Sequence, residues 1–151
     1  MRIDWEEYAT DDFLRLDREL DEYYRATFGA QADKYRPYAS YESATDFFIA
    51  YEGGMPVAIA AFKPYPERGA AELKRVFVKE AFRRLGVGSR VLDKVEESIK
   101  RKGYARVKIE TGAGKENVAA QEFYKKRGYL TVKGWGAFSD DPAVVCMEKE
   151  L

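Results

Sequence analysis

The sequence of 151 residues contains no histidine and a single cysteine, and these two shortages exclude several kinds of chemistry. Without histidine the commonest general base is missing, together with Ser-His and Cys-His nucleophile pairs and most zinc and iron sites. Cys146 alone cannot form an intramolecular disulfide, which is typical of a reducing compartment. Any proton transfer must therefore use carboxylates, tyrosines, lysines or backbone groups, and no metal site is expected.

The sequence also lacks a long apolar run and a net charge. The longest uncharged stretch, residues 53–62, is too short to cross a bilayer, and the N-terminal residues contain no apolar signal segment. The 26 basic residues balance 26 acidic ones, so no overall field attracts nucleic acid or an anionic membrane. We predict a cytoplasmic protein without a membrane or nucleic-acid partner.

The residues that are present suffice for one compact core, because 46% are apolar and 15% are aromatic. Their periodicity predicts a mixed α/β order of strand, helix, three strands, helix, strand, helix and two strands. Helices are expected over residues 11–24, 86–102 and 118–127, with Thr10 and Asn117 as caps of the first and last. Strands are expected before residue 10 and over residues 46–51, 57–62, 71–78, 106–111, 129–135 and 144–150. A turn is expected over residues 64–69, and residues 31–43 show no clear period.

The segment Arg83-Arg84-Leu85-Gly86-Val87-Gly88 joins the strand over 71–78 to the following helix. The first N–H groups of a helix are unpaired and lie at its positive end, so they bind anions well. Gly86 and Gly88 lack the Cβ atoms that would keep a pyrophosphate away, and the two arginines add positive charge. The loop alone is explained equally well as an ordinary helix start with solvated arginines.

The same segment fits the Arg/Gln-x-x-Gly-x-Gly/Ala signature of the GCN5-related N-acetyltransferase (GNAT) superfamily, which the chain resembles. Asn117, Ala120, Phe123-Tyr124 and Gly128-Tyr129 are similar to the second cofactor motif of that superfamily. The C-terminal part resembles a bacterial subgroup whose substrates are mostly unassigned. The resemblance implies one α/β domain over residues 1–151, with a mixed, mostly antiparallel sheet of six to seven strands and about four flanking helices.

The resemblance further implies that acetyl-CoA is the acyl donor and lies where strands 71–78 and 106–111 separate. The pyrophosphate would lie on the N–H groups of residues 84–89, and the pantetheine would pair with the backbone of Phe77 and Val78 like an added strand. Asn117 would bind the pantetheine arm. The implied cofactor-binding residues are Phe77, Val78, Arg83, Arg84, Leu85, Gly86, Val87, Gly88, Ser89, Asn117 and Tyr124.

The implied reaction is direct transfer of an acetyl group to a primary amine of a small molecule or a protein. Tyr124 would protonate the leaving thiolate or donate a hydrogen bond to it. Glu72 on the central strand is the leading candidate for the base, and Glu110 and water are the alternatives. Strand alternation places Glu72 on the same face as Lys74 and Val76, unless a β-bulge reverses the order.

Charge is unevenly distributed: residues 1–50 contain 12 acidic and 6 basic groups, and residues 74–108 contain 12 basic and 4 acidic groups. By resemblance the acidic N-terminal helix borders the acceptor, where it would favour a cationic amine. A solvated helix face explains the acidic residues of segment 17–22 as well. A non-catalytic acyl-CoA-binding module and a plain α/β interaction domain stay open as alternative functions, and a homodimer stays open as the assembly.

Overall fold

A computed structural model describes residues 1–67 and 69–151, and within these residues seven strands form one sheet in the order β1-β2-β3-β4-β5-β7-β6. The strands are β1 (Asp4–Glu6), β2 (Asp46–Glu52), β3 (Met55–Pro64), β4 (Ala70–Val78), β5 (Arg106–Gly112), β6 (Leu130–Val132) and β7 (Val144–Glu150). The α-helices of the described residues are α1 (Asp11–Phe28), α2 (Ala32–Ala39), α3 (Val87–Arg101) and α4 (Val118–Lys126). Arg68, in the turn predicted over residues 64–69, lies outside the described residues.

The predicted mixed α/β fold is confirmed, because β4 and β5 pair in parallel while the other paired strands run antiparallel. Two elements differ from the prediction. Helix α2 was not foreseen because it has no buried residue and contains Pro37, so it carries no apolar stripe. Strand β6 ends at Val132, short of the predicted residue 135, because residues 133–135 leave the sheet ahead of a 3-10 turn over Gly136–Phe138.

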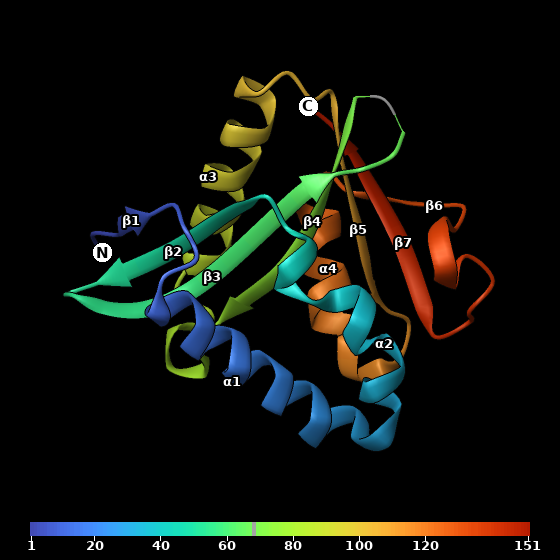
Figure 1. The fold of residues 1–151 in the computed structure, drawn as a ribbon, viewed down its shortest axis with the longest axis horizontal. Coiled ribbons are helices and arrows are strands. Elements are labelled where there is room, and N and C mark those ends of the chain that lie inside the picture. Colours follow the sequence, from blue (N-terminus) through green and yellow to red (C-terminus); the bar gives the residue numbers. More distant parts are fainter. Residues whose placement is uncertain (68) are drawn as a thin grey trace.

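Helices α1 and α2 lie on one face of the sheet, and α3 and α4 lie on the other (Figure 1). The hydroxyl oxygen of Thr10 accepts a hydrogen bond from the N–H of Phe13, which confirms the predicted cap of α1. The stripe Phe13, Leu16 and Leu20 of α1 packs against Ile59. Each such buried side chain stabilises the fold by about 1.5–3 kcal/mol. None of the helices in residues 1–67 and 69–151 has the length and apolar character needed to cross a bilayer.

Strands β4 and β5 pair over only three positions, Ala70 with Arg106, Ala71 with Val107 and Glu72 with Lys108. Beyond these pairs the two strands continue in the same direction and move apart, and α4 lies behind the space between them (Figure 1). From Leu73 onward, the β4 edge that faces β5 has no strand partner among the described residues. The predicted separation of these two strands is therefore present.

A β-bulge in β4 decides which side chains face α1. Ala61 and Ile59 are two residues apart on β3, but they pair with Lys74 and Phe77, which are three apart on β4. Arg75 takes up the extra residue with a φ of +57°. Phe77 therefore packs on the α1 face, while Val76 packs with the core beneath α3.

The alternation before the bulge places Glu72 on the α1 face as well, because its neighbours Ala71 and Leu73 both belong to the core beneath α3. Lys74 follows Glu72 by two residues and shares its face. The expectation that Val76 also shares this face is wrong, because the bulge reverses the order after Lys74.

Candidate active site

The loop between β4 and α3 brings together the arginines and glycines of the sequence motif. The Arg83 side chain folds back, so that its Nε donates a hydrogen bond to the Val78 carbonyl at 2.9 Å. Its guanidinium lies 5.3 Å from the Tyr23 ring centre and 5.7 Å from the Phe77 ring centre. Arg84 and Leu85 are exposed, Val87 is buried and Ser89 is half-buried at the start of α3. The loop thus presents positive charge beside the helix N-terminus.

Gly86 and Gly88 serve different purposes. Gly86 immediately precedes α3 with a φ of +80°, and a Cβ there would contact nothing within 4 Å, so its backbone conformation requires glycine. A Cβ on Gly88 would lie 3.3 Å from the Phe123 ring of α4. Gly88 therefore has a second reason to be glycine besides the proposed access for the pyrophosphate: it lets α3 pack closely against α4.

We expect Gly86→Glu to weaken acetyl-CoA binding at least tenfold, because it strains the loop and places a negative charge at the phosphate site. Calorimetric titration measures the affinity. Gly53→Glu is the matched control, since Gly53 also has a positive φ and open space but lies in the β2–β3 turn. A folded Gly86→Glu protein with unchanged affinity would contradict the proposed phosphate site.

Helix α4 is anchored to the end of β5 around Gly112. The Gln121 side-chain amide donates a hydrogen bond to the Gly112 carbonyl at 2.6 Å, and a Cβ on Gly112 would lie 2.1 Å from the Asn117 side-chain nitrogen. Asn117 occupies the predicted cap position before α4, but its side chain makes no capping hydrogen bond. Its amide instead lies against the last residue of β5, at the mouth of the space between β4 and β5.

Tyr124 is buried on α4, where its ring contacts Phe123 and Tyr129 at centre distances of 5.3 and 5.5 Å. Burial raises the pKa of Tyr124, and the nearby Tyr24 hydroxyl of α1 raises it further. Helices α4 and α1 lie on opposite faces of the sheet (Figure 1), and the effect of Tyr24 on the pKa of Tyr124 shows that these two side chains are close to each other.

Glu72 and Glu110 lie on the α1 face beside this separation, in different surroundings. The carboxylate of Glu72 is buried and lies 3.4 Å from the Lys74 ammonium and 4.0 Å from that of Lys63. Glu110 is half-buried on β5, two residues beyond the last β4–β5 pair. Within the described residues, neither an ion pair nor a hydrogen bond reaches its carboxylate.

The surroundings of Glu110 favour its neutral form. Burial raises the pKa of Glu110, and the negative charge of Glu72 raises it further, against the opposing effect of Lys74 and Lys63. Cys146 lies directly opposite Glu110 in the β5–β7 pairing and is buried, which raises the pKa of its thiol. Cys146 is thus a buried thiol that stays protonated, and a protonated thiol is a poor nucleophile.

The acidic segment of α1 is partly used inside the protein. The Arg75 Nε donates a hydrogen bond to the Asp17 carboxylate at 2.6 Å, and its Nη2 donates to Asp21 at 2.7 Å. Both predictions for segment 17–22, an acidic acceptor border and a solvated face, are therefore wrong for Asp17. Sequence could not reveal this pairing, because Arg75 reaches α1 only through the bulge. A polar cavity of about 160 Å³ adjoins the pair, between α1 and the segment that follows α2.

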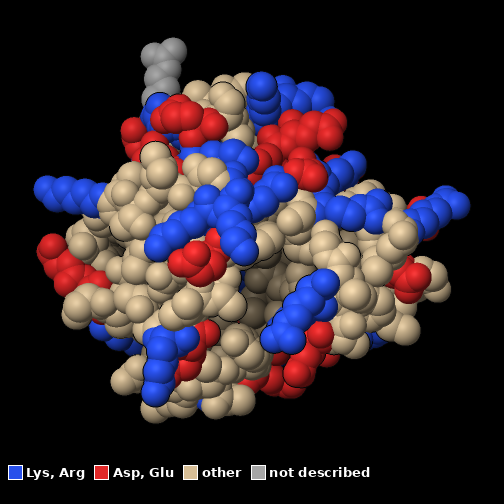
Figure 2. Space-filling view, turned by 180° about the vertical axis from the view of Figure 1, so that it is seen from behind, with Lys and Arg blue, Asp and Glu red and all other residues tan. Residues whose placement is uncertain are grey.

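The face that carries α3 and α4 is rich in lysine and arginine and is hollowed near its centre (Figure 2). Helix α3 ends in Lys100 and Arg101, and α4 ends in Lys125 and Lys126. No cluster of three or more histidine, cysteine or acidic residues in residues 1–67 and 69–151 is placed to hold a metal ion.

Comparison with known proteins agrees with this geometry. The sequence pattern of the acetyltransferase (GNAT) family matches residues 5–129. The chain belongs to this family of acyltransferases, as its resemblance predicts.

Similar proteins come from bacteria and archaea. The chain is 30% identical to the IAA acetyltransferase of Azospirillum brasilense over 70% of this chain and 67% of that protein. It is 33% identical to an uncharacterized N-acetyltransferase of Methanocaldococcus jannaschii over 83% of this chain but only 59% of that protein. The PaiA N-acetyltransferase of Thermoplasma acidophilum, solved in complex with coenzyme A, has the same fold. That comparison has a TM-score of 0.76 and 18% identity, and it covers 100% of both chains.

Proposed function

We propose that the protein transfers an acetyl group from acetyl-CoA directly to a primary amine. The observation that carries the proposal is the separation of β4 from β5, which Tyr124 approaches from one face of the sheet and Glu110 from the other. Such an opening lets a thioester meet an amine that arrives from the α1 face. The names of the relatives and the coenzyme A bound to the Thermoplasma acidophilum protein support the same donor.

The donor would lie along the unpaired edge of β4. Its pyrophosphate would rest on the N–H groups of residues 84–89, and its pantetheine would pair with the backbone of Phe77 and Val78. Arg83, whose Nε donates a hydrogen bond to the Val78 carbonyl, is exposed beside this loop and would pair with a phosphate. Asn117 would bind the pantetheine arm from the other side of the opening.

Glu110 is better placed than Glu72 to act as the base. An alkylammonium has a pKa of about 10 and must lose a proton before it attacks the thioester. Glu72 already pairs with Lys63 and Lys74, whereas no described ion pair occupies Glu110. Glu110 would take the proton directly or through a water, and Glu72 would act as a positioning residue whose charge raises the pKa of Glu110.

The remaining charges of the reaction would be stabilised by β4 and α4. A backbone N–H of β4 near Phe77 or Val78 would donate a hydrogen bond to the oxygen that becomes negative when the amine attacks. The C–S bond then breaks, and the thiolate leaves next to Tyr124. Because burial raises the pKa of Tyr124, its phenol stays protonated and acts mainly as a hydrogen-bond donor to the thiolate.

We expect Tyr124→Phe to lower kcat about 10- to 100-fold and to leave acetyl-CoA affinity within about threefold of the wild-type value, because only the leaving thiolate loses its donor. Steady-state kinetics together with calorimetry separate the two effects. Phe123→Leu is a control on the same helix that keeps the Tyr124 hydroxyl. An unchanged kcat in Tyr124→Phe would remove this residue from the mechanism.

The proposed activity is tested by incubating the full chain with acetyl-CoA and a panel of amines and peptides, followed by mass spectrometry of the products. A mass increase of one acetyl group on an amine, with release of free CoA, supports the proposal. Tight acetyl-CoA binding with no acetylated product would favour the non-catalytic acyl-CoA-binding module. The absence of acetyl-CoA binding would favour a plain interaction domain.

A further inference from the structure

We infer that the acceptor is a monocationic primary amine on an aromatic or alkyl body, without a carboxylate beside the amine. This inference rests on the proposed function and specifies the acceptor class for the same site. It follows from two observations on the α1 face around Glu110: the balance of the buried charges and a rim of five aromatic side chains. We call these side chains the aromatic rim; they are Tyr35, Tyr38, Tyr65, Trp135 and Phe138.

The lysines near Glu110 are already neutralised by other carboxylates. Lys63 and Lys74 share Glu72, Lys108 and Arg106 share Glu67 and Glu148, and Arg106 also pairs with Glu150. These ion pairs join four cations to four carboxylates. Glu110 thus contributes the charge that the described ion pairs leave unbalanced. One ammonium group would balance it, whereas a carboxylate next to that ammonium would find every described neighbouring cation already paired.

The first part of the aromatic rim is Tyr65, which follows β3, and Trp135, which follows β6. The backbone N–H of Trp135 donates to the thiol of Cys146, which is directly opposite Glu110 in the strand pairing. The Trp135 ring centre lies 4.7 Å from the Lys108 ammonium and 5.9 Å from the Tyr65 ring centre. Two aromatic rings therefore form an apolar wall next to the carboxylate that would receive the amine proton.

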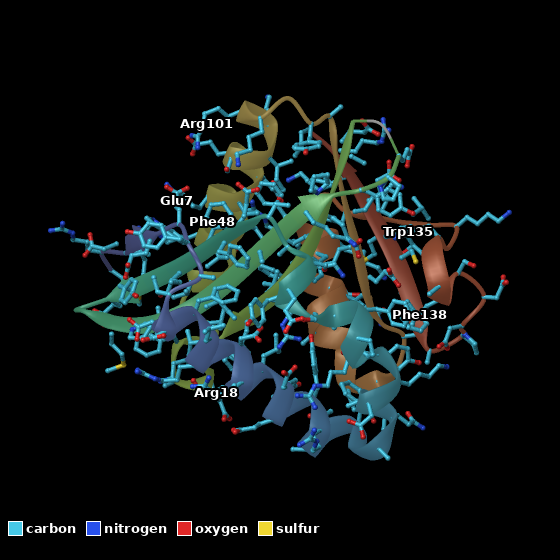
Figure 3. The ribbon with its side chains drawn as sticks, viewed as in Figure 1. Glu7, Arg18, Phe48, Arg101, Trp135 and Phe138 are labelled. Carbon is cyan, nitrogen blue, oxygen red and sulfur yellow. The ribbon has the colours of Figure 1, made fainter. Side chains whose placement is uncertain are left out.

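The second part of the aromatic rim comes from α2 and the turn after β6. The Tyr35 and Tyr38 rings of α2 each lie 4.8 Å from the ring centre of Phe138. Figure 3 shows Trp135 and Phe138 on the α2 side of β7. The Tyr38 carbonyl accepts a hydrogen bond from Lys74, which also pairs with Glu72. The contacts thus run from Trp135 through Phe138 and Tyr38 back to Glu72, on the face that carries Glu110.

Asp141 fixes α2 in this position. It accepts hydrogen bonds from the Tyr35 hydroxyl at 2.8 Å and from the Lys34 ammonium at 3.0 Å. These donors and, above all, the N–H of Ala143 lower the pKa of Asp141 to about 2, so it stays charged at physiological pH. The aromatic rim is therefore held together under the conditions in which the enzyme would work.

This arrangement selects a substrate by its chemistry. Aromatic side chains bury the apolar body of an acceptor and attract its cationic end, and Glu110 pairs with the ammonium before taking its proton. An arylalkylamine or an alkylamine meets both conditions. The corresponding α-amino acid places a carboxylate where the described cations already have partners, so the site would reject it.

The test compares amines that differ only in that carboxylate: phenethylamine with phenylalanine, and tyramine with tyrosine. We expect kcat/KM to be at least 100-fold higher for each amine than for its amino acid, and higher for phenethylamine than for ethanolamine. Equal values within either pair, or a preference for ethanolamine, would overturn the inference.

Variants at Trp135 test the aromatic rim itself. Trp135→Ala should raise the KM for phenethylamine at least tenfold and leave the KM for acetyl-CoA unchanged, whereas Trp135→Phe should stay within threefold of wild type. Trp135→Phe keeps an aromatic ring but removes the indole N–H, which is buried without a described partner. It therefore distinguishes the contribution of the ring from that of the N–H group. Leu130→Ala, at an exposed position on β6, is the control. An unchanged KM in a folded Trp135→Ala protein would contradict the role of the aromatic rim.

A failure of the proposed function can be told apart from a failure of this inference. If no amine in the panel is acetylated although acetyl-CoA binds, the proposed reaction fails. Calorimetry of phenethylamine and phenylalanine binding to the CoA-saturated protein then decides the inference by itself. Preferential phenethylamine binding that is lost in Trp135→Ala supports it, and equal or absent binding of the two compounds overturns it.

Discussion

Replacement of Glu110 by Gln is expected to lower kcat about 10²- to 10⁴-fold, the usual contribution of a general base. Gln has nearly the same shape but cannot take a proton from the ammonium group. Acetyl-CoA affinity should stay unchanged, because the proposed cofactor position lies along β4 and the α3 loop rather than on Glu110. Single-turnover kinetics and calorimetry on the same protein measure these two quantities.

The raised pKa of Glu110 also predicts the direction in which activity changes with pH. Burial and the charge of Glu72 raise the pKa of Glu110, and a base acts only when it is ionised. The kcat/KM of the wild-type enzyme should therefore rise with pH through a value above the ordinary glutamate pKa of about 4.3. Glu110→Gln should lose this acidic limb of the profile as well as most of the rate.

The raised pKa of Glu110 also predicts that Glu110→Gln, which lowers activity, increases stability. A carboxyl whose pKa is raised by folding is destabilising when ionised, above its folded pKa, and this effect disappears below its unfolded pKa. Glu110→Gln should therefore unfold at a higher temperature than wild type near pH 7.5, and the difference should vanish near pH 4. Thermal unfolding at the two pH values measures it.

Glu72→Gln distinguishes the role of Glu72 from that of Glu110. It removes a negative neighbour of Glu110, so the acidic limb of the pH profile should move to lower pH while most of kcat remains. It should also unfold at a lower temperature, because Lys74 loses its buried partner. The assignment would be reversed if Glu72→Gln abolished turnover and Glu110→Gln kept it.

Sequence periodicity was sufficient to predict the fold because the main elements carry strong local patterns. The stripe of Val91, Leu92 and Val95 marked α3, and the alternation of Val107 and Ile109 marked β5. Helix α2 was missed because its rings pack against a distant turn rather than a core stripe. Periodicity reports burial on one element, and it cannot report a contact between two exposed ones.

The candidate cofactor loop had a clearer sequence signal than the candidate base. Gly86 and the arginines before it are adjacent in the chain, so the proposed phosphate site corresponds to a short motif in the sequence. The choice between Glu72 and Glu110 depends on which lysines reach each carboxylate, and Lys63 comes from a different strand. The aromatic rim had no signal either, since Tyr35 and Phe138 are about 100 positions apart.

Arg75→Ala should reduce the free energy of unfolding by about 3–5 kcal/mol, the usual cost of removing one partner from a buried ion pair. The Arg75 side chain is only 3% exposed and binds the carboxylates of Asp17 and Asp21 together with the Asp17 carbonyl. Its loss would leave two acidic groups beneath α1 without their cation. Urea unfolding monitored by circular dichroism measures the change.

Arg15→Ala is the control on α1, the helix that Arg75 contacts, because Arg15 forms an exposed pair with Asp12 at 3.4 Å. Such a pair contributes about 0–1 kcal/mol, so this variant should unfold almost like wild type. Arg75→Lys keeps the charge but not the planar fork that binds two carboxylates, and it should fall between the two. A loss below about 1 kcal/mol in Arg75→Ala would show that the bulge and α1 hold together without this pair. A larger loss, accompanied by weaker acetyl-CoA binding, would show that α1 fixes the bulge that directs the β4 backbone toward the thioester.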